Sequence, residues 1–74
     1  MEQDILNYAT KLTSLHYVIE VSQTDDHKCD GKTAIGAHAK RSGGLIFPQV
    51  FDLPIDDTKT LLTSNGFNFH SPLY

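Results

Sequence analysis

Four basic side chains and two histidines gather between His27 and Gly44, and these are residue types that bind phosphate and carboxylate groups. With one acid among them, the segment carries a charge of about +3 and the rest of the chain about −6, within a net charge of −3. Clustered charge steers association even where the net charge does not. The four basic residues are Lys28, Lys32, Lys40 and Arg41.

The second half of this segment, from Gly36 to Gly44, is the stronger candidate for a binding site. Lys40 and Arg41 supply charge, and backbone N–H groups near the paired glycines can complement a phosphate. His38 adds an imidazole just before them. The GxxxxGK[ST] spacing of a Walker loop is missing. The alternative is a hairpin tip that two cations keep soluble, with His38 as a half-exposed strand residue.

The first half holds metal-binding residue types in the run Asp25–Gly31, but their spacing does not fit a metal site. A calcium loop beginning at Asp26 would have a lysine at its third position and an alanine at its twelfth, where oxygen ligands are needed. Cys29 is the only cysteine, and His27 is the only histidine near it. No sequence feature places a base beside this thiol. We therefore expect no metal, no cofactor and no catalytic residue.

Length and composition predict one small domain spanning residues 1–74. A chain of this length buries only about 60% of its unfolded surface, so self-association would stabilise it. The hydrophobic content of 39% is too high for a disordered tail. A lone cysteine and an acidic N-terminus favour the cytoplasm. No apolar run approaches the roughly 20 residues that span a bilayer, so we expect no membrane partner.

Hydrophobic periodicity predicts the order α-β-β-β-α, with a fourth β segment at the end. Apolar residues at helical spacing predict a helix around Ile5–Leu12, and strict alternation predicts a strand over Leu15–Val21. Further strands are predicted at Thr33–Ala39 and Leu45–Leu53. Pro48 places the last of these at a sheet edge or at a bulge, because proline cannot donate to a ladder.

A short helix is predicted in the C-terminal third. Asp56 or Asp57 can cap it, with Ile55 before it as a hydrophobic staple. Asn65-Gly66 then offers the left-handed residue that ends a helix. An alternating apolar segment predicts a last short strand or a packed extended stretch, and residues 70–74 are expected to form a loose tail. The whole is an α+β fold, a two-layer sandwich with a three- or four-stranded, mainly antiparallel sheet and both helices on one face.

A hairpin of the second and third strands, closed through residues 40–44, sets the expected register. The glycines in this loop allow the positive φ that such turns need. Small residues then face large ones, and the apolar side chains share one side of the sheet. The expected pairs are Ala39–Leu45, Ala37–Phe47, Ile35–Gln49 and Thr33–Phe51.

This register divides the sheet into a covered and an open face. The helices are expected to cover the side of Tyr17, Ile19, Phe47 and Phe51. The open face is expected to carry His16, Val18, Glu20, His38, Lys40, Ile46 and Val50. Because this face is more apolar than a solvated face needs, we expect a contact surface on it, beside the basic loop. The expected binding residues are His38, Lys40, Arg41, Ile46, Val50 and Val18.

The predicted element order resembles the double-stranded-RNA-binding fold, which the small HicA-type toxin ribonucleases also use. Gly36-Ala37-His38, then Phe47-Pro48, then Leu61-Leu62 with Asn65-Gly66 are similar to that family's Gly-Ser-His, Val-Pro and terminal-helix elements. The resemblance implies that His38 matches the family's catalytic histidine. The chain departs from the family at Ala37, which replaces serine, and in the length of its first strand. It also carries acids at the start of the second helix, where double-stranded-RNA binders carry lysines.

Three hypotheses for the function follow. The first is a non-enzymatic interaction or regulatory protein that binds a protein partner, or a second copy of itself, through the open sheet face and the basic hairpin. The alternative is a nucleic-acid-binding protein or small ribonuclease that uses His38, Lys40 and Arg41. The third is a subunit that is stable only within a larger complex. The acidic net charge disfavours nucleic acid, because phosphate binding relies on Lys and Arg.

Overall fold

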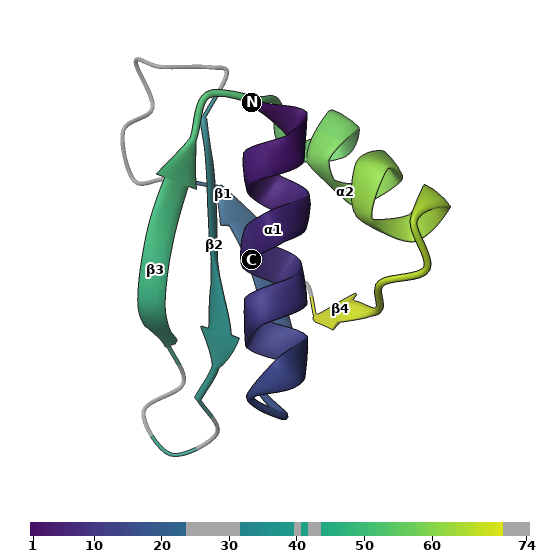
Figure 1. Cartoon of the computed structure of the whole chain (residues 1–74). Helices are drawn as coiled ribbons and strands as arrows, with labels where there is room; N and C mark the ends of the chain where they lie inside the picture. The colour runs from purple at the N-terminus through teal and green to yellow at the C-terminus, as the bar shows by residue number, and fades with distance from the viewer. Residues whose placement is uncertain (24–31, 40, 42–43, 71–74) are drawn as a thin grey trace.

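The computed structural model describes residues 1–23, 32–39, 41 and 44–70, and in it two helices lie on one side of a four-stranded sheet (Figure 1). The predicted connection after Gln23, the residue Lys40 and residues 71–74 of the expected tail lie outside the described residues. No helix of the described residues is long and apolar enough to cross a membrane. In chain order the elements are α1 (Glu2–Ser14), β1 (Ile19–Gln23), β2 (Thr33–His38), β3 (Leu45–Phe51), α2 (Ile55–Ser64) and β4 (Phe69–His70).

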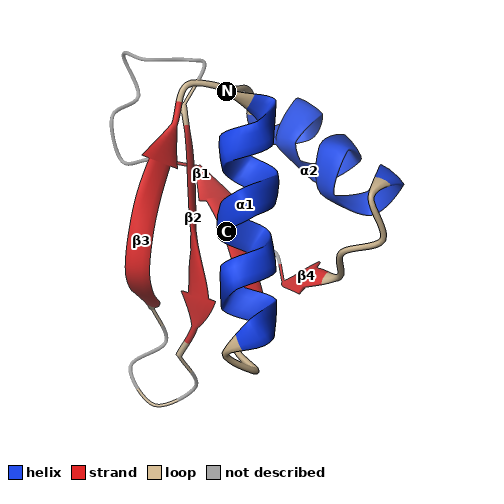
Figure 2. Ribbon diagram, in the orientation of Figure 1, coloured by secondary structure: helices blue, strands red, loops and turns tan. Residues whose placement is uncertain are grey.

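The sheet has the strand order β3-β2-β1-β4, and it confirms the predicted α+β fold (Figure 2). β2 pairs antiparallel with both β1 and β3. β4 pairs parallel with β1, with Phe69 beside Ile19 and His70 beside Glu20. The segment after α2 is therefore a fourth strand of the same sheet. His70 belongs to this strand, whereas we had expected it to be part of a loose tail.

Helix α1 ends in a backbone motif that the sequence prediction missed. The N–H of His16 donates to the carbonyl of Thr13, and that of Tyr17 to the carbonyl of Leu12. His16 has a φ of 63°, the left-handed conformation that this type of helix end requires. The strand predicted from Leu15 is wrong over its first four residues, because the helix end turns the chain there and β1 begins at Ile19.

Helix α2 begins at Ile55, two residues earlier than a cap at Asp56 would allow. Its N-cap is Pro54, and no side chain makes a capping hydrogen bond. Asp56 and Asp57 instead lie in the first turn, where negative charge interacts favourably with the helix dipole. The predicted aspartate cap and the staple at Ile55 are therefore wrong. The predicted end is confirmed, since Gly66 has a φ of 83°.

The predicted β2–β3 register is right at one end of the hairpin and wrong at the other. Up to Ile35 and Gln49 the strands pair as expected, and beyond them the register shifts by one. The shift arises because β3 has one more residue than β2 between the two sets of pairs, which is a β-bulge. The observed pairs are Thr33–Phe51, Ala34–Val50, Ile35–Gln49, Ala37–Ile46 and His38–Leu45.

The bulge lies at Phe47 and Pro48 on the edge strand, as the proline predicted. Phe47 has a φ of 55°, which bends β3 locally. The facing residue, Gly36, lets the two backbones approach closely: a Cβ on it would lie 2.8 Å from the carbonyl oxygen of Ile46. The glycine is thus needed for space rather than for a special φ.

The hydrophobic core lies between the helices and one face of the sheet. Two buried threonines join α2 to this layer: the hydroxyl of Thr58 in α2 donates to that of Thr33 in β2 over 3.5 Å, and Thr33 donates to the carbonyl of Leu53 over 2.6 Å. Both helices contribute to the core, so both cover the same face (Figure 1). The buried core residues are Ile5, Ala9, Leu12, Ile19, Val21, Ile35, Ala37, Phe51 and Leu62.

Candidate functional site

The residues expected to form one contact surface do not lie together on the open face. Val18 and Val50 are both exposed, but Val18 precedes β1 near His38, whereas Val50 pairs with Ala34 toward the other end of β2. Ile46 packs against the core, because the bulge turns it to the helix side, so its open-face placement was wrong.

The basic hairpin is only partly within the described residues. Arg41 is exposed in the β2–β3 turn, whereas Lys40 lies outside them. His38 ends β2 and is partly exposed. The binding role of all these residues stays a prediction.

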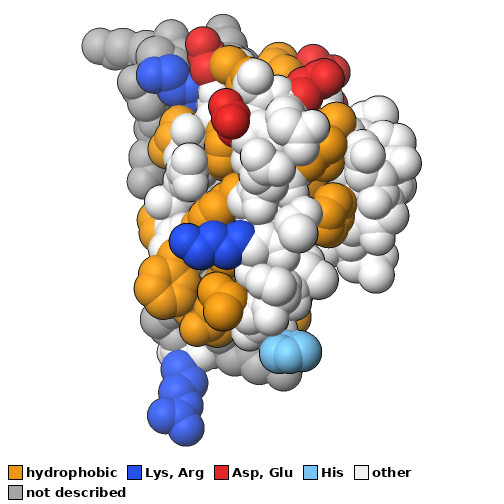
Figure 3. All heavy atoms as spheres, in the orientation of Figure 1, with side chains coloured by type: hydrophobic (Ala, Val, Ile, Leu, Met, Phe, Trp, Pro, Cys, Tyr) orange, Lys and Arg blue, Asp and Glu red, His pale blue; other side chains and the backbone are white. Residues whose placement is uncertain are grey.

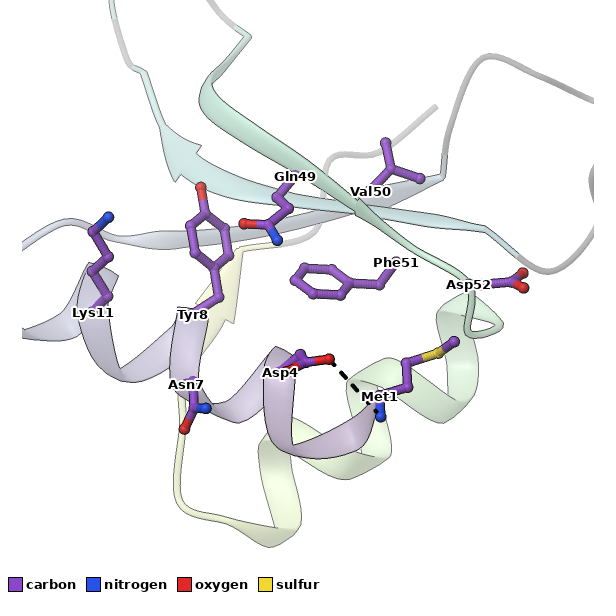
Figure 4. A pocket seen from close by; sticks show the side chains of 9 residues that line it. All are labelled: Met1, Asp4, Asn7, Tyr8, Lys11, Gln49, Val50, Phe51 and Asp52. Atoms are coloured by element: carbon purple, nitrogen blue, oxygen red, sulfur yellow. Dashed lines mark ion pairs between the residues drawn. The ribbon is translucent and has the colours of Figure 1, made fainter.

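A groove runs between α1 and the edge strand β3, on the side expected to be covered by helices. We call it the α1–β3 groove; it consists of two hollows that both include Tyr8 and Lys11 in their walls. The larger, of about 630 Å³, reaches from Met1 to Asp52 (Figure 4). The smaller, of about 290 Å³, is lined mainly by apolar and aromatic side chains, including Leu12. The groove exists because α1 leaves the edge strand uncovered (Figure 2).

Tyr8 crosses the groove and joins its two sides. Its hydroxyl donates to the carbonyl of Phe47, and its ring packs on that of Phe51 with 6.1 Å between centroids. Figure 4 shows Tyr8 rising from α1 toward β3, with the Phe51 ring directed into the space between them. Burial raises the pKa of the Tyr8 hydroxyl, because the charged phenolate would be poorly solvated there.

Leu15, Tyr17 and Phe47 form an exposed aromatic patch at one end of the groove. The rings of Tyr17 and Phe47 lie 5.8 Å apart, and these residues are 39% and 61% exposed. We had expected both to lie beneath the helices, and the bulge and the helix end explain why they do not. Figure 3 shows apolar side chains exposed on this face, with the acidic side chains in its upper part and basic side chains at the upper left, near the middle and at the lower end.

Phe47 combines exposure with backbone strain. A left-handed φ costs a non-glycine residue about 1–2 kcal/mol, and a following proline adds further restriction. The tyrosine hydroxyl and the ring contact with Tyr17 hold it in place. A large apolar side chain kept exposed at a strained position is a pointer to a contact surface.

A second cluster, formed by Glu20, His38 and His70, lies on the opposite face of the sheet. Their strand neighbours Ile19, Ala37 and Phe69 belong to the core or pack against it. Successive side chains of a strand point to opposite faces, which places the three polar side chains away from the helices. Two strand pairings bring them together: β1 with β2, and β1 with β4.

The cluster is compact and partly buried. The Nδ1 atom of His38 lies 3.0 Å from Oε2 of Glu20, whose side chain is only 5% exposed. The ring of His70 lies 4.3 Å from that of His38, at an interplanar angle of 43°. One ligand atom from each residue lies within 4.8 Å of the others. Such a set can orient an imidazole for proton transfer or bind a metal ion.

The sequence pointed to part of this cluster only. Alternation in the strands put Glu20 and His38 on the same face, but their contact depends on the register. His70 was missed, because a two-residue strand that pairs parallel with β1 leaves only the weak alternation of Phe69 and His70 as a signal.

No family model, no curated protein and no solved structure matches the chain. The resemblance to HicA-type ribonucleases stays a prediction.

Proposed function

We propose that this chain is a small, non-enzymatic interaction protein whose contact surface is the α1–β3 groove with the aromatic patch at its end. The observation that carries the proposal is the exposed ring pair of Tyr17 and Phe47. Exposed aromatic side chains beside an apolar hollow are typical of the anchors of protein interfaces. A domain of 74 residues has few large apolar side chains with which to build a core. The exposure of two of them therefore favours a function at the surface.

The charges along the groove favour a second copy of the chain as the occupant. Asp4 and Asp52 line the hollow at one end. Lys11 borders the apolar hollow toward the other end, and the exposed Arg41 lies in the turn that leads into β3 there. Two copies related by a two-fold axis across the groove would place the acidic end of each against the basic end of the other. Any other protein partner is expected to present apolar side chains with basic groups toward one end and acidic groups toward the other.

Sedimentation of the pure protein over a range of concentrations tests the proposal. We expect a dimer that dissociates on dilution and weakens with salt, because charge contacts are screened. Phe47→Asn and Arg41→Glu should both shift the equilibrium to monomer. Val18→Asp is the control, since Val18 is about as exposed as Phe47 but lines neither hollow. A strict monomer, or a dimer that only Val18→Asp disrupts, would contradict this assignment.

A second candidate function is cleavage of RNA by acid–base chemistry at His38. The contact between Nδ1 of His38 and Glu20 supports it, because a carboxylate that fixes one ring nitrogen leaves the other for proton transfer. His70 offers a second imidazole beside the first. The resemblance noted above also pairs His38 with a catalytic histidine.

An RNA-cleavage assay at low salt tests this candidate. Cleavage should be lost in His38→Ala and reduced in Lys40→Glu/Arg41→Glu, and it should survive a chelator if the chemistry is acid–base alone. Neither binding nor cleavage of any RNA, or activity retained by His38→Ala, would eliminate it.

A further inference from the structure

We infer that Glu20, His38 and His70 form a binding site for one divalent transition-metal ion, with zinc as the best match. The site lies on the face of the sheet opposite the α1–β3 groove, so it is independent of the interaction surface proposed above.

The donor set points to this class of metal. Two imidazole nitrogens and one carboxylate oxygen form a set found in zinc sites that keep a fourth position for water or a substrate. Calcium and magnesium prefer oxygen ligands throughout, which two histidines do not supply. Copper, nickel and cobalt ions accept the same donors, so a probe metal can be chosen from this group.

The distances between the ligand atoms fit a zinc ion once the side chain of His70 moves closer. The 3.0 Å between Nδ1 of His38 and Oε2 of Glu20 is close to the separation of neighbouring ligands around a zinc ion, about 3.3 Å for bonds of about 2.0–2.1 Å. The widest pair of ligand atoms lies within 4.8 Å, whereas every pair of ligands around a tetrahedral zinc ion lies about 3.3 Å apart. His70 is exposed at the end of a short strand, so its side chain can close this difference.

Burial of the carboxylate supports the inference. The side chain of Glu20 is 5% exposed, and within the described part of the chain it contacts the imidazole of His38. Removing a carboxylate from water is costly unless opposite charge or several hydrogen bonds compensate it. A divalent cation would supply that charge, and it would also use lone pairs of the two neighbouring imidazole rings.

The backbone fixes the ligands in advance. Glu20 is the central residue of the arrangement, because it pairs with Gly36 on one side and with His70 on the other. The N–H of His38 donates to the carbonyl of Val18 over 2.7 Å, which holds the end of β2 against the segment before β1. Ligands on paired strands lose little freedom on binding a metal, which favours affinity.

Titration of the chelator-treated full chain with Co²⁺ tests the inference, because the visible absorption of bound cobalt reports its coordination. We expect one equivalent to bind with a four- or five-coordinate spectrum, and Zn²⁺ to displace it. Glu20→Gln and His70→Gln should each weaken binding by more than about 100-fold, since even residues behind the ligands are worth 10–100-fold. The exposed position of His70 makes its variant the one least expected to disturb folding, which circular dichroism checks.

Two control variants separate this site from other metal-binding groups. His16→Asn removes an exposed histidine outside the cluster, and His27→Gln/Cys29→Ser removes the imidazole and the thiol of residues 24–31. Both should bind one equivalent of Co²⁺ with unchanged affinity. The inference is overturned by an absence of binding, by affinity that survives in His70→Gln, or by affinity lost in either control.

Discussion

Nδ1 of His38 and Oε2 of Glu20 lie 3.0 Å apart, although the two residues come from different strands and Glu20 is almost fully buried. The pair predicts a coupled effect on stability. His38→Leu should lower the free energy of unfolding by about 1–3 kcal/mol, because it leaves a buried carboxylate without this partner. Adding Glu20→Gln should restore part of the loss, because the amide is easier to bury than a charge. Chemical denaturation of the two single variants and the double variant measures the coupling, and strict additivity would contradict it.

The close packing around Gly36 predicts that any larger residue there destabilises the fold. A Cβ on it would lie 2.8 Å from the backbone oxygen of Ile46 and 3.2 Å from the Cα of Pro48, and backbone atoms cannot move aside cheaply. Gly36→Ala should therefore lower the free energy of unfolding by about 1–3 kcal/mol. Gly44→Ala is the matched control, because its Cβ would meet no atom within 4 Å. Equal effects of the two substitutions in thermal unfolding would show that the bulge is not tightly packed.

The left-handed residue at the end of α1 predicts a stabilising substitution. His16 has a φ of 63°, which costs a residue with a Cβ about 1–2 kcal/mol and costs glycine little. His16→Gly should raise the free energy of unfolding by about 0.5–1 kcal/mol after the larger entropy loss of glycine on folding. Gly66→Ala is the converse test at the end of α2, where it should destabilise. A loss of stability in His16→Gly would mean that its side chain contributes more than the strain costs.

The sequence predicted the elements better than it predicted their ends. Alternation and helical spacing were enough to predict the α+β order of elements, and Pro48 indicated an edge strand or a bulge. The register shift beyond the bulge could not be foreseen, because it depends on the close approach of Gly36 to β3. The end of α1 was missed because histidine is an unusual left-handed residue.

Of the candidate site, the sequence foresaw His38 but not its surroundings. The alternating pattern placed Glu20 on the same face, yet it could not show that their side chains touch. His70 joins them only through the parallel pairing of β4, a contact far along the chain with almost no local signal. The groove escaped prediction because it depends on how far α1 extends across the sheet.

The hydroxyl of Tyr8 predicts a pH dependence of stability. Burial raises the pKa of this group in the folded chain above its ordinary value of 10.0. The contribution to stability is fully present below the unfolded pKa and is lost as the pH rises through the folded pKa, because the unfolded chain gives up its proton first. The phenolate also could not donate to the carbonyl of Phe47.

Tyr8→Phe isolates this contribution. At neutral pH the variant should be less stable, by about 0.5–1.5 kcal/mol for one lost hydrogen bond. Above pH 10 the difference in stability between the two proteins should shrink. Only the wild type has a hydroxyl at position 8, and its deprotonation favours the unfolded chain. Tyr17→Phe, on the same face, is the control for general alkaline effects and should track the wild type. Parallel stability curves for Tyr8→Phe and wild type across this range would mean that Tyr8 titrates alike in the folded and unfolded chain.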